Sequence, residues 1–405
     1  MPSRHPVAPS APARTDPRPL RPDLWLLDPA TTHLNHGSYG AVPRPVLDAQ
    51  RRAAEAIERS PERFYRTDLE PAIDAVRRRA AEFLGVDQGG LVLVQNATEA
   101  VQVALNGVRL APGAEVVYTD HAYPWVKAAV ARACAERGAV PRCVELPDPA
   151  GLTSAEFTTA LLAALAGALT ERSALLVIDQ ITSASALKLP VEAVCAEFGG
   201  AVPVLVDGAH APGLLDAPVP AGAAFWYGNL HKWAFAARTA AALVVAPEWR
   251  DRVQPLVASA GAARGYPGSF SYLGTQDPTA YLALPAALDF PSEHLGLTFA
   301  ALARRNADVL ALGLAQLAGR LGLRPPPATD LPLATVPLGW DGGDAEAWEL
   351  GDRLRERGVE VAAVTMGGRL HLRLSVQAYV GLEAFDVLAT ELARLAPRDR
   401  ASRRP

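Results

Sequence analysis

The sequence contains little cysteine and no excess of charge of either sign. Its 405 residues include three cysteines, Cys134, Cys143 and Cys195, and no CxxC or Cys/His spacing suggests zinc or a redox pair. We therefore expect no metal site, and the isolated thiols fit a reducing cytosol. Lysine and arginine total 39 against 43 for aspartate and glutamate. That balance provides neither the basic surface of a nucleic-acid-binding protein nor a membrane-binding patch.

Long apolar runs are also lacking. The first residues hold Arg4, His5, Arg14 and several prolines instead of an apolar core, so no secretory signal is expected. The longest apolar stretch, residues 161–178, is interrupted at 170–173 and is typical of a helix followed by a strand. These features predict a cytoplasmic protein without a membrane partner.

The chain is long enough for two domains between two tails. Residues 1–22 and 397–405 are rich in Pro, Arg and Ser and are expected to be disordered or frayed. A large domain over 23–290, with its N-terminal segment, and a smaller α+β domain over 291–396 are expected between them. The large domain alternates apolar strands with amphipathic helices, which indicates βαβ units and a mainly parallel sheet covered on both faces. The predicted strands of this domain include 91–94, 115–118, 174–178, 202–206 and 241–245.

Asp207 and Lys232 each follow a short apolar run. Both therefore lie just past the carboxyl end of a probable parallel strand, where open α/β sheets bind ligands. An acid and an amine together there are what a pyridoxal phosphate site requires. The lysine forms a Schiff base with the aldehyde, and the acid keeps the pyridine nitrogen protonated. The plainer alternatives are that Asp207 caps a turn and that Lys232 is a surface charge, although aromatic neighbours favour a desolvated amine.

Two other loops after strands carry candidate ligand contacts. Asn96, Ala97 and Thr98 lie between a strand and a helix, where free N–H groups suit a phosphate. A simple helix cap is the alternative. In TDHAYPW, His121 could stack on a heteroaromatic ring and Tyr123 could reach a substrate, unless His121 is an ordinary loop residue.

Two further segments complete the candidate site. In GNLHKW, Asn229 and His231 could reach phosphate oxygens while Lys232 points at the aldehyde. Period-two alternation over 369–375 places Arg373 on a strand flanked by core leucines, where it is suited to a bidentate grip on a carboxylate. An internal salt bridge is the alternative for Arg373.

Together these segments resemble the class V aminotransferase family of fold-type I pyridoxal phosphate enzymes, and most closely its isopenicillin N epimerase-like branch. The resemblance covers residues 30–396. It rests on LNHGSYGAVP (34–43), VLVQNATEA, TDHAYPW, VDGAHAPG, YGNLHKW, GTQDPTAYLALPAALDF (274–290) and RLSVQAY (373–379). It implies an α/β fold with a mainly parallel sheet of the seven-stranded type, a small C-terminal α+β domain, and pyridoxal 5'-phosphate as cofactor.

The resemblance also implies roles for the matching positions. Lys232 would hold the cofactor and move the Cα proton, Asp207 would pair with the pyridine nitrogen, His210 would lie near the phenolic oxygen, and His121 would stack on the ring. Phosphate contacts would come from the turn that begins at Asn96 and from Ala97, Thr98, Asn229 and His231. Thr275 would reach the phosphate of a neighbouring subunit, which implies a homodimer. Arg373 would bind the substrate carboxylate, beside a substrate-side segment made of Asn35, His36, Gly37 and Ser38.

The implied activity is chemistry at the α-carbon of an amino acid or amino-acid conjugate through aldimine and quinonoid intermediates. Epimerisation is the first expectation, with Tyr123, His210 or Tyr39 as a second acid/base. C–S β-lysis of a cysteine conjugate and transamination are alternatives, and a non-catalytic binding module is a further one. A desulfurase is disfavoured because residues 359–370 lack the nucleophilic cysteine of those enzymes. Gln276, Arg238 and the segment 179–185 depart from the branch's pattern and leave the substrate open.

Overall fold

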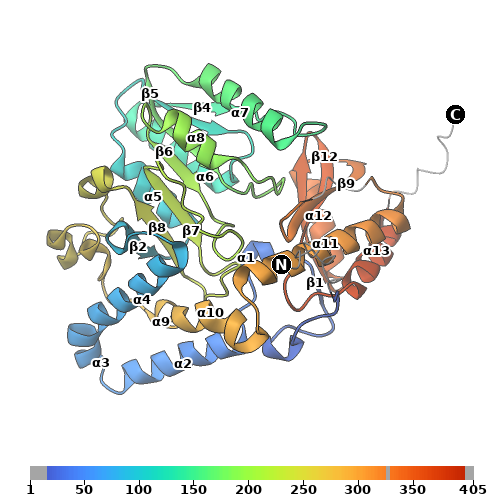
Figure 1. The fold of residues 1–405 in the computed structure, drawn as a ribbon, viewed down its shortest axis with the longest axis horizontal. Helices are drawn as coiled ribbons and strands as arrows, with labels where there is room; N and C mark the ends of the chain where they lie inside the picture. The colour runs from blue at the N-terminus through green and yellow to red at the C-terminus, as the bar shows by residue number, and fades with distance from the viewer. Residues whose placement is uncertain (1–15, 325–328, 397–405) are drawn as a thin grey trace, which may run out of the picture.

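A seven-stranded sheet forms the centre of the larger lobe in the computed structural model, which describes residues 16–324 and 329–396 (Figure 1). The strand order is β2-β8-β7-β6-β5-β3-β4, and β8 alone is antiparallel to its neighbours. The bounds are β2 Leu91–Val94, β3 Glu115–Thr119, β4 Val140–Val144, β5 Ser173–Asp179, β6 Val204–Asp207, β7 Phe225–Asn229 and β8 Ala241–Val245. The predicted mainly parallel α/β fold is confirmed.

Helices cover both faces of this sheet and explain why its strands are apolar along their whole length. On one face, α5 (Ala97–Gly107) and α6 (Pro124–Arg137) pack in one apolar cluster with the sheet. On the other face, a second cluster includes α4 (Leu69–Leu84), α7 (Ser154–Ala168) and α8 (Val191–Phe198). Every residue of β2, β6 and β7 is buried. Residues at the carboxyl ends of β5, β6 and β7 are therefore held on a rigid frame.

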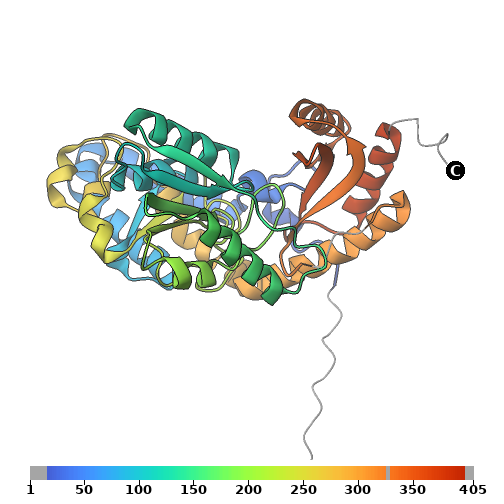
Figure 2. The same cartoon turned by 90° about the horizontal axis from the view of Figure 1, so that it is seen from above.

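The smaller lobe has its own sheet and its own apolar core (Figure 2). Strands β9 (Leu333–Asp341), β11 (Ala362–Met366) and β12 (Arg369–Ser375) form an antiparallel sheet in the order β11-β12-β9. Helices α11 (Phe299–Leu321), α12 (Asp344–Arg355) and α13 (Glu383–Leu395) belong to this part of the chain. This is the α+β arrangement that the sequence predicts for the C-terminal region.

The N-terminal segment packs with the smaller lobe before it enters the larger one. Strand β1 (Thr32–His33) pairs with β10 (Val359–Glu360), and the Leu20 amide donates a hydrogen bond of 2.7 Å to the Ala378 carbonyl. The described part of the predicted tail, residues 16–22, thus contacts the smaller lobe. The rest of that tail and residues 397–405 lie outside the described residues. A two-residue strand is too short to leave a periodic signal, so the sequence assigns this segment to the large domain instead.

Short helices connect the N-terminal segment and the sheet to the rest of the molecule. Helix α1 (His36–Tyr39) lies between the two lobes in Figure 1 and leads into the long helix α2. The remaining helices are α2 Arg44–Glu58, α3 Pro61–Arg63, α9 Thr279–Leu282 and α10 Leu284–Phe290. Within the two described ranges, none of the helices combines the length and apolar character needed to cross a bilayer.

Candidate active site

A cavity of about 270 Å³ lies at the carboxyl-terminal edge of the large sheet. The last residues of β5, β6 and β7 line it with polar side chains, namely Asp179, Asp207 and Asn229. This is the edge at which parallel α/β sheets bind ligands. The structure brings together here ten of the residues predicted from the sequence: Ser38, Asn96, Ala97, Thr98, Tyr123, Asp207, His210, Asn229, His231 and Lys232.

One end of the cavity is built around the first turn of α5. The Asn96 side chain caps the helix by accepting a hydrogen bond of 2.9 Å from the Glu99 amide. The Asn229 side chain accepts a second one, also 2.9 Å, from the Ala97 amide. Strand β7 and helix α5 are therefore tied together where the helix N-terminus faces the cavity. Amide N–H groups and the helix dipole make this end suited to a phosphate.

Lys232 lies in a chain of nitrogen contacts with a defined direction. The Trp233 indole N–H donates to Nδ1 of His210 at 3.3 Å, and Nε2 of His210 lies 3.3 Å from Nζ of Lys232. An indole nitrogen can only donate, so Nδ1 must accept and a neutral His210 carries its proton on Nε2. Burial lowers the pKa of His210 well below its ordinary value, which keeps the ring neutral. The proton on Nε2 then points at the lone pair of a neutral Lys232 amine.

The same surroundings make Lys232 a weak base for a lysine. Burial, with the positive charge of Arg373 as a second cause, lowers its pKa to about 7, and the charge of Asp207 offsets only part of this. A neutral amine is the form that attacks an aldehyde or accepts a proton from carbon. The environment therefore prepares Lys232 for either task at neutral pH.

Asp207 is fixed at the end of β6, with 4 % of its surface exposed. Its Oδ1 accepts a hydrogen bond of 2.9 Å from the Ala209 amide. Gly208 permits this turn, because a Cβ there would lie 2.4 Å from the Trp226 ring nitrogen. Burial raises the pKa of Asp207, and the Ala209 amide, the Tyr227 hydroxyl and the Lys232 charge oppose this rise in part.

Arg373 on β12 is a buried cation whose partners among the described residues are all neutral. One guanidinium nitrogen donates to the carbonyl and hydroxyl of Ser183 at 2.9 and 3.1 Å. The other donates to Ser38 Oγ at 2.6 Å and to Asn35 Oδ1 at 3.3 Å, while Nε is buried without a partner. Burial lowers the pKa of Arg373 to about 10. A buried cation that lacks an internal anion is suited to the carboxylate of a ligand, and the salt-bridge alternative does not hold for the described residues.

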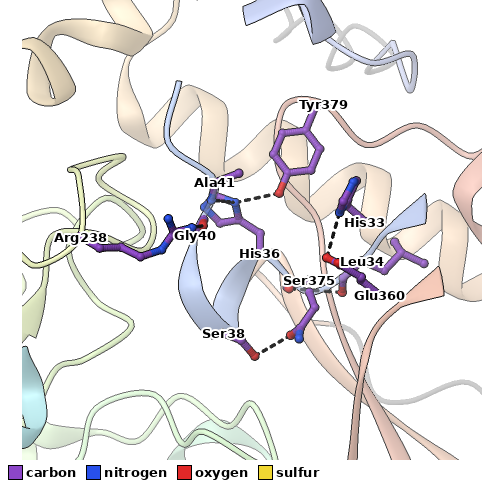
Figure 3. Close-up of polar contacts among 11 residues, drawn as sticks. His33, Leu34, His36, Ser38, Gly40, Ala41, Arg238, Glu360, Ser375 and Tyr379 are labelled. Atoms are coloured by element: carbon purple, nitrogen blue, oxygen red, sulfur yellow. Dashed lines mark hydrogen bonds and ion pairs between the residues drawn. The ribbon is translucent and has the colours of Figure 1, made fainter. Parts of the chain in front are cut away.

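His36 and Gly37, which the sequence assigns to substrate binding, are not among the residues that line the cavity. Figure 3 shows the His36 ring next to the Tyr379 hydroxyl. The His36 ring is buried and contacts the Lys232 carbonyl through Nε2 and the Tyr379 hydroxyl through Nδ1, both at 3.0 Å. The Gly37 amide donates to Ser375 Oγ at 2.9 Å. These contacts connect the lysine's backbone to the smaller lobe, which suggests a supporting rather than a ligand-contacting position.

Four other predicted residues are absent from the cavity lining, namely Asn35, His121, Thr275 and Arg373. Asn35 and Arg373 adjoin the cavity through their hydrogen bonds with Ser38. His121 bonds through Nδ1 to Ser185 Oγ at 2.7 Å. Thr275 lies in the loop that precedes α9, where the Tyr65 hydroxyl donates to the neighbouring Gln276 carbonyl. Their proposed cofactor contacts, His121 with the ring and Thr275 with a second subunit's phosphate, remain predictions.

The sequence reasoning missed several residues that line this cavity, and Asp179 and Ser183 are the two that matter for its chemistry. Asp179 ends LLVID as Asp207 ends VLVD, so the same signal marks both carboxylates. Ser183 follows in the same loop and gives no pattern of its own. Arg238, noted only as a departure from the family pattern, lines the cavity and donates to the Tyr39 and Gly40 carbonyls.

Known proteins have sequences similar to that of this chain. A family model described as the DegT/DnrJ/EryC1/StrS aminotransferase family matches residues 49–223. The isopenicillin N epimerase of Amycolatopsis lactamdurans is 32% identical, over 74% of this chain and 78% of that protein. This chain belongs to the class V aminotransferase family, in the isopenicillin N epimerase-like branch. The predicted resemblance is confirmed, and with it a pyridoxal phosphate-dependent enzyme.

Other relatives carry a different printed activity. A putative L-cysteine desulfhydrase of Oryza sativa subsp. japonica is also 32% identical, over 73% of this chain but only 64% of its own length. Among solved structures, the cystine C–S lyase C-DES superposes with a TM-score of 0.74 at 20% identity, covering 91% of this chain and 98% of that one. The Escherichia coli cysteine desulfurase CsdA gives a TM-score of 0.73 at 17% identity, over 92% and 96%. At these identities the structures establish the fold.

The cavity has the chemistry that pyridoxal phosphate needs. A helix N-terminus suits its phosphate, a buried carboxylate suits its pyridine nitrogen, and a neutral lysine amine suits its aldehyde. Arg373 Nε, buried without a partner, leaves a donor free for a further anionic group. The residues present therefore fit the cofactor that the family uses.

Proposed function

We propose that this enzyme removes the α-proton of an amino acid or amino-acid conjugate, and that epimerisation at Cα is its first outcome. The observation that supports the proposal is that Ser38 and Ser183, the hydrogen-bond partners of Arg373, line the same cavity as Lys232. Lys232 lines the cavity, and the Arg373 charge is near enough to lower the pKa of the Lys232 amine. A base and a carboxylate anchor that close together can address the carbon between an amino group and a carboxylate.

Four groups of residues would hold the cofactor. The α5 N-terminus with Asn96, Ala97 and Thr98, together with Asn229 and His231, would bind the phosphate. Asp207 would pair with the pyridine nitrogen, His210 would face the phenolic oxygen, and Lys232 would hold the aldehyde carbon. When bound, pyridoxal phosphate supplies an electron sink that stabilises negative charge at Cα.

The chain's own side chains then handle the substrate and its proton. Arg373 would bind the α-carboxylate through the guanidinium nitrogens that now contact Ser38 and Ser183. Lys232, as a neutral amine, would take the Cα proton at Nζ. For epimerisation, a second group must return a proton to the other face of the carbon. Tyr123 lines the cavity, and burial, with Tyr39 as a second cause, raises the pKa of its hydroxyl, so it stays a proton donor.

A C–S β-lyase acting on cysteine or a cysteine conjugate is the second candidate. It is favoured by the desulfhydrase relatives and by the cavity of about 270 Å³, which suits a compact substrate. In this outcome, loss of the Cα proton is followed by departure of the sulfur group as a thiol. A product imine then hydrolyses to pyruvate and ammonia.

One incubation separates these outcomes. The purified holoenzyme is mixed in deuterium oxide with L-amino acids, L-cysteine and cysteine S-conjugates, and the products are analysed by chiral chromatography and mass spectrometry. Cα deuteration with loss of chirality supports epimerisation, and pyruvate with a released thiol supports the lyase. A keto acid with pyridoxamine phosphate supports transamination. No deuterium at Cα and no product from any substrate would support a non-catalytic module.

We further propose a homodimer in the cytoplasm. Thr275 lies outside its own subunit's cavity, so a contact with phosphate requires a second copy of the chain. All three cysteines are free, as a reducing compartment would leave them. Sedimentation of the wild type tests the dimer, and titration of the wild type and of Thr275→Val with pyridoxal phosphate tests the contact. A monomeric wild type would contradict the dimer, and equal cofactor affinity in the two proteins would contradict a contact across the interface.

A further inference from the structure

Two buried carboxylic side chains lie side by side at the floor of the cavity. Asp179 and Asp207 are register partners in the parallel strands β5 and β6. Neighbouring strands are about 4.8 Å apart, and partners in register point to the same face of the sheet. Both residues line the cavity, with 2 % and 4 % of their surfaces exposed. The two carboxyl groups are therefore neighbours that share one poorly solvated space.

The charges around this pair do not balance two carboxylates. Tyr227 is the register partner of Asp207 on β7 and contributes a neutral hydroxyl. Lys232 faces the same cavity, but its pKa of about 7 leaves it largely neutral at physiological pH. From α6, the Lys127 ammonium donates to the Asp120 carbonyl, and its charge offsets only part of the rise in the Asp179 pKa. The backbone amides of Asp179 and Tyr123 also favour an ionised Asp179, but they offset only part of the effect of burial on its pKa. Two adjacent buried carboxyls in such surroundings cannot both ionise, so one keeps a proton.

The local contacts decide which carboxyl keeps the proton. Asp207 receives the Ala209 amide on Oδ1, and the Tyr227 hydroxyl also favours its ionised form. For Asp179, burial is the largest cause and the charge of Asp207 the second, and both raise its pKa well above the ordinary value. Two residues of one type are thus driven to opposite protonation states by their environments.

We propose that Asp179 is a positioning residue that stays a neutral acid and donates its proton in a hydrogen bond to Asp207. The Asp207 carboxylate then gains Asp179 as a further donor, besides the Ala209 amide and the Tyr227 hydroxyl. The pair carries a single negative charge, which matches the single positive charge of a protonated pyridine ring. The inference rests on the proposed role of Asp207 but is independent of the reaction that follows.

The first test measures the stability of the cofactor-free protein against pH. When the pKa of a carboxyl group is raised in the folded state, the protein becomes less stable as the pH rises from the pKa in the unfolded state, about 3.9, toward the pKa in the folded state. Urea unfolding of the wild type and of Asp179→Asn is compared from pH 5 upward. The unfolding constant of the wild type should rise relative to that of the variant by up to about tenfold per pH unit in this window. A ratio that stays constant with pH would overturn the proposal.

The Asp207→Asn variant tests the same interaction from the other residue, and it can be used if Asp179→Asn does not fold. The pH dependence of its stability is measured in the same way. The variant removes the neighbouring charge, so the pH dependence contributed by Asp179 should move to lower pH than in the wild type. An unchanged pH dependence would mean that the two carboxyls do not interact, which contradicts the proposal.

The second test measures pyridoxal phosphate affinity by equilibrium titration. Asp179→Ala removes the donor and should weaken binding by about tenfold, whereas Asp179→Asn keeps a neutral donor and should weaken it less. If Asp179→Asn binds more weakly than Asp179→Ala, a neutral donor at this position does not support cofactor binding and the inference fails. If instead Asp207→Asn binds as tightly as the wild type, the proposed role of Asp207 fails, whatever the Asp179 variants show.

Discussion

Nζ of Lys232 lies 3.3 Å from Nε2 of His210, and the other nitrogen of that ring accepts the Trp233 indole N–H at the same distance. The consequence is a directed chain in which Trp233 determines where the His210 proton resides and His210 presents that proton to the lysine. Lys232 must be neutral to act. Trp233, its neighbour in the sequence, therefore influences the protonation of Lys232 through the His210 ring and not through a direct contact of the indole ring with the amine.

Trp233→Phe should raise the pKa of Lys232 by about one unit, because His210 can then place its proton on Nδ1 and accept from an ammonium through Nε2. The measurement is the pH profile of the rate at which pyridoxal phosphate attaches to the cofactor-free protein. Trp226→Phe is the matched control, since Trp226 is equally buried but donates to Gln180 Oε1 at 3.1 Å. Identical shifts in the two variants would show that lost packing, not the His210 contact, is responsible.

Lys232→Met should stabilise the cofactor-free protein at pH 6 by about 2 kcal/mol, because the fold disfavours a protonated amine at this position. A lowered pKa in the folded state means that wild-type stability rises with pH between the folded value, about 7, and the ordinary value of 10.5. The advantage of the variant should shrink over that window. Urea unfolding at pH 6, 8 and 10 measures this, and a gain that is equal at all three pH values would contradict the shifted pKa.

Arg373→Lys should raise the KM for an amino-acid substrate by about 10- to 100-fold, with a smaller effect on kcat, because an ammonium cannot bind a carboxylate bidentately. Steady-state kinetics on the substrate found in the deuterium experiment provides the measurement. Arg369→Lys, an exposed arginine at the start of the same strand, is the control. If Arg369→Lys raises KM as much as Arg373→Lys does, carboxylate recognition by Arg373 is refuted.

Asn96→Ala should both destabilise the fold by about 1 kcal/mol and weaken pyridoxal phosphate binding, because it removes the cap from the helix that faces the phosphate. Thr153→Ala removes the cap of α7, which lies outside the cavity, and should cost similar stability with no change in cofactor affinity. Thermal unfolding and equilibrium titration of both variants measure the two effects. Equal affinities in the two variants would show that the α5 N-terminus does not contact the phosphate.

Much of the large domain could be predicted because its strands are short, continuous and apolar. Strands β2 and β8 have the bounds that the sequence predicts. Strand direction leaves no trace in such runs, so the antiparallel β8 could not be foreseen. The edge strand β4 (Val140–Val144) was not predicted because it is mostly exposed and contains Pro141.

The candidate site also contains residues whose position could be predicted from the sequence and residues whose position could not. Residues that directly follow a strand or begin a helix, such as Asp207, Thr98 and Lys232, line the cavity as their position in the sequence predicts. The orientation of a side chain within a turn depends on packing that the sequence does not display. His36 therefore lies behind Lys232, against the Trp233 and Tyr379 rings, although its motif predicts a place beside the substrate.

The central claim, that Lys232 is the residue that binds the cofactor, is tested most directly by borohydride reduction of the purified protein with pyridoxal phosphate, followed by peptide mass spectrometry. The expected result is one pyridoxyl adduct, on the peptide that contains Lys232, with none formed in Lys232→Ala. A protein that stays colourless with the cofactor and yields no adduct, or an adduct on Lys127 or Lys188 that persists in Lys232→Ala, would contradict the claim.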